Sequence, residues 1–203
     1  MRVTRVQAEG NRQAVINVAS RLFREHGFDG IGLKDLMEAA GLTQGAFYKQ
    51  FVSKQDLTAQ ASTRALENAS RRWSDAAAAN PEDPLGAVIA FYLSMEHRAE
   101  TMDGCPIVAL GSDAARQGVD VKASFEAGIR QYLEMLGGWI GDADGAERGG
   151  RAMSALSTMV GAVILSRAVN DERLSKQFLQ AAAESVQSGS SASDARPGSR
   201  GMP

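Results

Sequence analysis

The sequence predicts an all-α fold in two parts, a small N-terminal three-helix domain followed by a larger helical domain. Apolar residues recur every three or four positions along most of the 203-residue chain, as on the buried face of amphipathic helices. No segment alternates apolar and polar residues with the period of two that is typical of strands. Since 44% of the side chains are hydrophobic, the chain has enough apolar material to bury a core.

The first helix is predicted to run from Asn11 to about His26, with Gly27 as its stop. Its apolar stripe is Val15, Val18, Ala19, Leu22 and Phe23. Residues 1–10 show no apolar periodicity and are expected to form a flexible arm. We expect this helix to brace the two helices that follow it.

Two short helices joined by a sharp turn are predicted within residues 33–54. The buried stripe of the first is Leu33, Leu36, Met37 and Ala40. Gly41 follows this stripe, at a position where the backbone turns left-handed and only glycine fits cheaply. Thr43 is the expected N-cap of the second helix, because its hydroxyl can accept a free backbone N–H.

The second short helix has two different faces. At about 100° per residue, Ala46 and Phe47 point toward the core, and four other residues share the opposite arc. These four are Gln44, Gly45, Tyr48 and Lys49. A helix, a glycine turn and a second helix with a free polar face form the helix-turn-helix arrangement, whose second helix enters the major groove of DNA.

Residues 27–57 resemble the N-terminal domain of TetR-type transcriptional regulators, over about the first quarter of the chain. The residues that match in register are Gly27, Phe28, Ala40, Gly41, Leu42, Thr43, Phe47, Tyr48, Phe51, Ser53, Lys54 and Leu57. Gly32 departs from the Ser or Thr usual there and offers no side-chain oxygen to a phosphate. The resemblance implies a homodimeric regulator, as a family expectation a repressor, that binds a double-stranded DNA operator and responds to a small-molecule effector.

Six residues are the predicted DNA contacts. The candidates for base edges are Gln44, Gly45 and Lys49, and the candidates for phosphates are Thr43, Tyr48 and Lys54. Lys54 stands in the first turn of the next helix, where the helix dipole favours an anionic partner; the alternative is a solvated lysine. The arm at residues 1–10 either reaches phosphates or a minor groove or is a frayed terminus.

The N-terminal part of the chain carries a small excess of positive charge, as binding to DNA phosphates requires. Residues 1–58 carry eight Lys or Arg against six acids, although the whole chain has a formal charge of −2. The asymmetry is mild, and it supports the helix-turn-helix prediction without establishing it.

Further helices follow to residue 186. Ser53 and Asp56 form a capping pattern that starts a helix continuing to about Ala79, and residues 80–84 break it. Later helices are expected around residues 85–102, 106–118, 121–140, 156–164 and 174–186. The predicted domains are residues 1–52 for DNA binding, 53–186 for effector binding and dimerisation, and 187–203 as a disordered Gly/Ser-rich tail.

The last two helices are expected to form the dimer interface, as the resemblance implies. The predicted interface residues are Leu156, Val160, Val163, Ile164, Leu174 and Phe178. One short recognition helix makes few base contacts, so two half-sites would roughly double the binding energy. The alternative is that these helices only close the core of one chain.

An effector pocket is expected among aromatic and methionine side chains of the larger domain, which adapt to irregular ligands but also form plain core. The candidates are Phe91, Tyr92, Met95, Cys105, Met135, Trp139 and Met159.

Cys105 carries the alternative function. It is expected at or next to the N-cap of a helix that starts with Pro106, where the helix dipole favours a thiolate. Gly104, Cys105 and Pro106 also resemble a TetR branch that includes electrophile sensors. The alternatives are therefore a thiol-based redox or electrophile sensor and a buried cysteine that acts as a small apolar residue.

An enzyme is not expected. Two histidines and one cysteine supply too few ligands for a zinc site, so no metal or cofactor is predicted. No nucleophile, base and orienting group can be assigned, so no catalytic residue is predicted either. The competing class is a helical enzyme or protein-binding module that merely retains the helix-turn-helix. The single cysteine and the lack of a signal peptide or long apolar run predict a cytoplasmic protein with no membrane partner.

Overall fold

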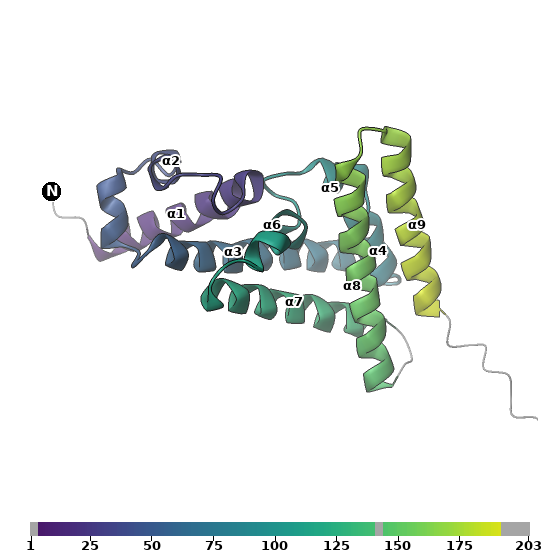
Figure 1. The fold of residues 1–203 in the computed structure, drawn as a ribbon. Helices are drawn as coiled ribbons and strands as arrows, with labels where there is room; N and C mark the ends of the chain where they lie inside the picture. The colour runs from purple at the N-terminus through teal and green to yellow at the C-terminus, as the bar shows by residue number, and fades with distance from the viewer. Residues whose placement is uncertain (1–3, 141–143, 192–203) are drawn as a thin grey trace, which may run out of the picture. The chain divides into compact units, whose positions relative to one another are not determined.

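A computed structural model of the chain describes residues 4–140 and 144–191 (Figure 1). Within these ranges the backbone forms helices and turns with no strand, which confirms the predicted all-α fold. The helices are α1 (Arg5–His26), α2 (Leu33–Ala39), the 3₁₀ helix η1 (Gln44–Lys49), α3 (Lys54–Ala79), α4 (Pro84–Tyr92), α5 (Met95–Ala99), α6 (Pro106–Ala114), α7 (Val119–Trp139), α8 (Gly145–Ala168) and α9 (Glu172–Ser191). None of them combines the length and the apolar character that crossing a lipid bilayer requires.

The residues form two compact units. The first unit is Met1–Asp75 together with Glu96–Gln131, and the second is Ala76–Met95 together with Tyr132–Pro203. Helices α3 and α7 run through both units. The predicted functional boundary after residue 52 lies inside the first unit and stays a prediction.

Helix α1 begins at Arg5, well before the predicted Asn11. The Thr4 hydroxyl caps it by accepting the backbone N–H of Gln7 at 3.2 Å. Residues 5–10 are therefore helical, and the prediction of a flexible arm was wrong for them; residues 1–3 lie outside the described part. Each of residues 4–10 is exposed, so this first stretch has no buried face that apolar periodicity could reveal.

The core of the first unit joins α1 to α7. Phe28, which follows α1, meets the Phe23 ring edge-on at 5.4 Å between ring centroids and the Phe125 ring of α7 at 6.5 Å. All three rings are buried. The three-helix head and a helix of the predicted body therefore share one set of packed aromatic side chains.

Helices α8 and α9 pack along each other in the second unit. The Ser175 hydroxyl donates to the backbone oxygen of Ser166 at 2.9 Å, and both residues are fully buried. Ala155 of α8 and Ala182 of α9 are buried as well. Helix α9 continues to Ser191, so residues 187–191 are helical where a disordered tail was predicted; the rest of that tail lies outside the described residues.

Candidate nucleic-acid interface

The turn between α2 and η1 has the geometry predicted for it. Gly41 adopts a φ of 71°, in the left-handed region. Its N–H donates to the oxygen of Glu38, and the N–H of Leu42 donates to the oxygen of Met37, each at 2.9 Å. These bonds satisfy carbonyls at the end of α2 and turn the chain sharply into η1.

The segment η1 separates a packed side from an exposed side. Phe47 is 1% exposed and stacks on Phe51 with 5.3 Å between ring centroids. Tyr48 is 71% exposed, and its ring meets the edge of Phe47 at 5.2 Å. The other exposed residues here are Thr43, Gln44, Gly45 and Lys49. The polar candidates of η1 are thus available to a partner.

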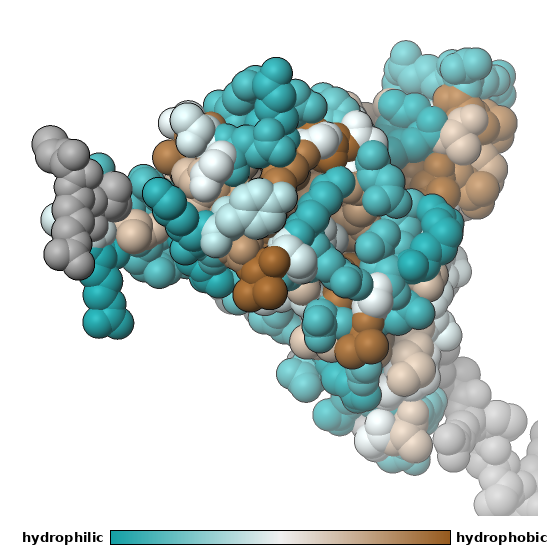
Figure 2. Space-filling view, turned by 60° about the vertical axis from the view of Figure 1, so that its left-hand side comes forward, coloured by the Kyte–Doolittle hydropathy of each residue, from teal (hydrophilic) through white to brown (hydrophobic). Residues whose placement is uncertain are grey.

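Figure 2 shows a mostly hydrophilic surface on the side that comes forward, with separate hydrophobic residues between the polar ones. Val52, just after η1, is an apolar residue that is 91% exposed.

The capping of the two helices around this site differs from the prediction in one respect. Thr43 has the extended backbone of an N-cap, but its side chain makes no capping hydrogen bond. Its hydroxyl is therefore not engaged in the cap, which the sequence prediction had assumed. By contrast, Ser53 accepts the N–H of Asp56 at 3.0 Å, as the capping pattern predicted. The Asp56 carboxylate accepts the N–H of Val52 at 3.1 Å, one residue before the cap.

Lys54 has a structural role that the sequence did not reveal. Its Nζ donates to the backbone oxygens of Phe28 and Ile31, at 2.8 Å each. Two of its three donors therefore close the loop between α1 and α2. The predicted phosphate contact stays a prediction, and it would use the third donor.

Replacing Lys54 with methionine is expected to destabilise the protein by about 1–3 kcal/mol, because it leaves two half-buried or buried carbonyls without their donor. Urea unfolding followed by circular dichroism measures the loss. The matched control is Lys49→Met, which removes an exposed lysine of η1 and should weaken DNA binding at unchanged stability. If Lys54→Met is as stable as the wild type, the bonds from Lys54 to the loop between α1 and α2 do not stabilise the fold.

Arg12 is a second residue that sequence reasoning missed. Its Nε donates to the backbone oxygen of Gln50 at 3.3 Å, and its guanidinium lies 5.2 Å from the centroid of the Phe51 ring. Arg12 thereby holds the end of η1 against α1. The only hint in the sequence is a cation in the first helix, which does not identify its partner.

Cys105 takes the predicted N-cap position of α6, with Pro106 next in the helix. The residue is only 3% exposed, so a reagent would have to enter the packed first unit to reach its sulfur. Burial agrees with the alternative in which the cysteine is a small apolar residue, and the sensing role stays a prediction. The described residues hold no group of three or more His, Cys, Asp or Glu that suits a metal ion.

The other pocket candidates belong to the second unit. Tyr92 and Met159 are fully buried, whereas Phe91, Met95, Met135 and Trp139 are partly exposed. Met95 lines a hollow of about 260 Å³ between α4 and α9, together with Ile89, Leu93 and Leu179. A groove of about 500 Å³ between α8 and α9 is lined by none of the candidates. Which cavity would hold an effector stays a prediction.

The predicted interface residues divide by their burial. Val163 and Leu156 are buried in the single chain, and their contact with a partner subunit stays a prediction. Ile164 is 44% exposed and Leu174 is 39% exposed, and Val160 and Phe178 are partly exposed. Leu165, which the sequence did not single out, is 48% exposed. Three large apolar side chains therefore face outward near the junction of α8 and α9.

Comparison with known proteins agrees with this geometry. Residues 15–61 match the family model described as bacterial regulatory proteins, tetR family. The transcriptional regulator AcrR of Shigella flexneri is 33% identical over 87 residues, which are 43% of this chain and 40% of AcrR. The transcriptional repressor NemR of Escherichia coli K12 is 23% identical over 128 residues, which are 62% of this chain and 64% of NemR. The matched stretches therefore span less than two thirds of these relatives.

Solved structures share the fold over most of the chain. The reduced form of E. coli NemR superposes with a TM-score of 0.74 at 18% identity, covering 88% of this chain and 96% of that one. A TetR transcriptional regulator from Chloroflexus aurantiacus gives 0.75 at 23% identity, covering 90% and 96%. At these identities the likeness establishes the fold, including an N-terminal helix-turn-helix domain.

Proposed function

We propose that this chain, which belongs to the TetR family of bacterial regulatory proteins, is a DNA-binding transcriptional repressor that leaves its operator when a small-molecule effector binds. The observation that carries the proposal is the face of η1, where Phe47 is buried while Gln44, Tyr48 and Lys49 are exposed. A short helix with this division can lie in a major groove. Its role is therefore regulatory rather than catalytic.

Two copies of the chain would present two such faces to two half-sites. Because binding at the second half-site is intramolecular once the first is occupied, affinity depends steeply on the spacing between the heads. An effector that binds more tightly to a dimer with another head spacing shifts the protein toward that dimer. Operator affinity then falls, at most by the ratio of the effector's affinities for the two spacings. Bacterial operators lie in the cytoplasm, and we place the protein there.

A mobility-shift assay with DNA flanking the protein's own gene tests the proposal. The expected result is retardation of one duplex that survives an excess of a scrambled duplex of equal length and composition. Gln44→Ala should relax the preference at the base pair that it reads, while the affinity for scrambled DNA stays the same. Equal binding of specific and scrambled duplexes, or no binding at low salt, would favour the competing class that retains the helix-turn-helix without its function.

A further inference from the structure

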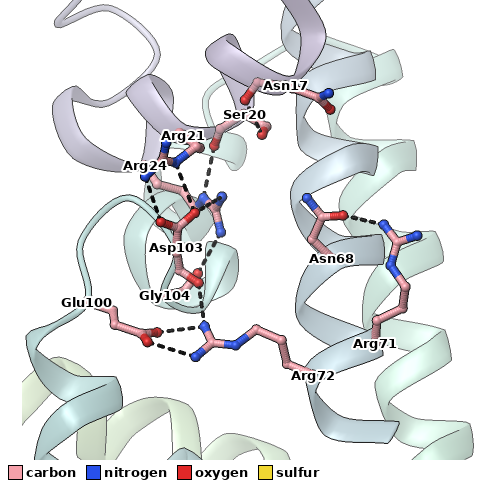
Figure 3. Close-up of polar contacts among 10 residues, drawn as sticks. All are labelled: Asn17, Ser20, Arg21, Arg24, Asn68, Arg71, Arg72, Glu100, Asp103 and Gly104. Carbon is pink, nitrogen blue, oxygen red and sulfur yellow. Dashed lines mark hydrogen bonds and ion pairs between the residues drawn. The ribbon is translucent and has the colours of Figure 1, made fainter. Parts of the chain in front are cut away.

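A polar cluster in the first unit joins the three-helix head to residues 100–104, the segment between α5 and α6 (Figure 3). We name this stretch the latch segment. Arg21 of α1 donates from Nε and Nη2 to the two carboxylate oxygens of Asp103, at 3.0 and 2.8 Å. Asp103 thus receives a two-pronged arginine contact from a residue 82 positions earlier in the chain.

A second arginine of α1 reaches the same segment from inside. The side chain of Arg24 is only 2% exposed. Its Nε donates to the backbone oxygen of Ser20 and its Nη1 to that of Gly104, at 2.9 Å each, while Nη2 lies 3.8 Å from Asp103. A buried guanidinium requires acceptors and a counter-charge close by, and moving the latch segment away from α1 would remove the Gly104 oxygen and the Asp103 carboxylate from this charge.

Helix α3 holds the other end of the latch segment. Arg72 binds both carboxylate oxygens of Glu100, at 2.6 and 2.8 Å, and donates to the backbone oxygen of Asp103 at 2.7 Å. The hydrogen bond with Glu100 raises the pKa of Arg72, although burial acts in the opposite direction. Arg72 therefore stays charged throughout the pH range in which the protein works.

We propose that Asp103 is a positioning residue that fixes the head against the α5–α6 region and thereby sets the spacing of the two heads in the dimer. Exposed ion pairs such as Arg21 with Asp103 contribute little to the free energy of folding. The role that we assign to this pair is to fix the position of α1 relative to the latch segment. This inference rests on the proposed function and assigns to it the residue through which the head is held.

The experiment measures how operator affinity depends on the spacing between the half-sites. A residue that only stabilises the fold would not change this dependence. Duplexes are first selected from a randomised pool with the wild-type dimer, and then remade with one base pair inserted between the half-sites, which rotates one of them by about 35°. Dissociation constants for both duplexes come from fluorescence anisotropy. The ratio of the two constants measures how firmly the heads are held.

Asp103→Asn keeps the shape of the side chain and the backbone oxygen for Arg72, but removes the charge. The spacing ratio is expected to fall about tenfold, because loosened heads adapt to the inserted base pair. Asp103→Glu should recover most of the ratio. The matched control is Glu126→Gln. It removes an exposed arginine contact, with Arg130, that stays within α7 and should leave the ratio unchanged.

The outcomes separate the two proposals. If Asp103→Asn folds normally by circular dichroism and keeps the wild-type spacing ratio, Asp103 is not a positioning residue, although the protein still binds its operator. If the wild type selects no duplex, the proposed function is wrong, and the positioning role of Asp103, which rests on it, is wrong too. If Glu126→Gln lowers the spacing ratio as much as Asp103→Asn does, the effect comes from net charge. The positioning role of Asp103 would then be wrong.

Discussion

Replacing Gly45 with leucine is expected to weaken operator binding strongly while the fold stays intact. Gly45 is exposed in η1, its φ is not positive, and a Cβ added to it meets no atom within 4 Å. The fold therefore does not require glycine there, and leucine is the better helix former. A glycine that the fold does not need fits a surface on which another backbone approaches closely. A leucine side chain would keep η1 out of the groove in both heads.

The loss of affinity should be roughly 100-fold or more, which corresponds to about 2.8 kcal/mol. Anisotropy titration with the selected duplex measures it, and a thermal melt checks that stability is unchanged or raised. The matched control is Gly138→Leu in α7, where an added Cβ also meets nothing within 4 Å and the residue is exposed. If Gly45→Leu binds the duplex as tightly as the wild type, η1 does not approach DNA along this side.

Features of the site that depend on neighbours in sequence could be predicted from the sequence. The left-handed backbone at Gly41 follows from the steric needs of a helix end, and the cap at Ser53 involves a residue three positions away. An α-helical spacing correctly predicted that Phe47 is buried while Gln44, Tyr48 and Lys49 are exposed, although the segment is a 3₁₀ helix. Each of these is a local constraint that a few residues satisfy by themselves.

The contacts that hold the head could not be predicted in the same way. Lys54 reaches Phe28 across 26 positions, and Arg21 reaches Asp103 across 82. A lysine or arginine in a helix has many possible partners, and only the folded chain selects one. Thr43 shows the reverse error, because its residue type and its extended backbone suit an N-cap hydrogen bond that its side chain does not make.

Replacing Ile164 with glutamate is expected to convert the dimer to a monomer and to lower operator affinity by a factor of about 10²–10⁴. Ile164, Leu165 and Leu174 are at least 39% exposed in the single chain, so the fold of one subunit does not bury them. Covering such residues with a second copy removes apolar surface from water. A carboxylate at position 164 would have to be buried without a partner, which opposes association.

Sedimentation at micromolar concentration should give about 21.5 kDa, the mass of one chain, for Ile164→Glu and twice that mass for the wild type. The matched control is Val119→Glu, since Val119 is an exposed apolar residue at the start of α7, and it should remain a dimer with normal operator affinity. A dimeric Ile164→Glu would place the interface elsewhere. A wild type that is monomeric and still binds its operator tightly would remove the coupling between half-sites on which release by an effector depends.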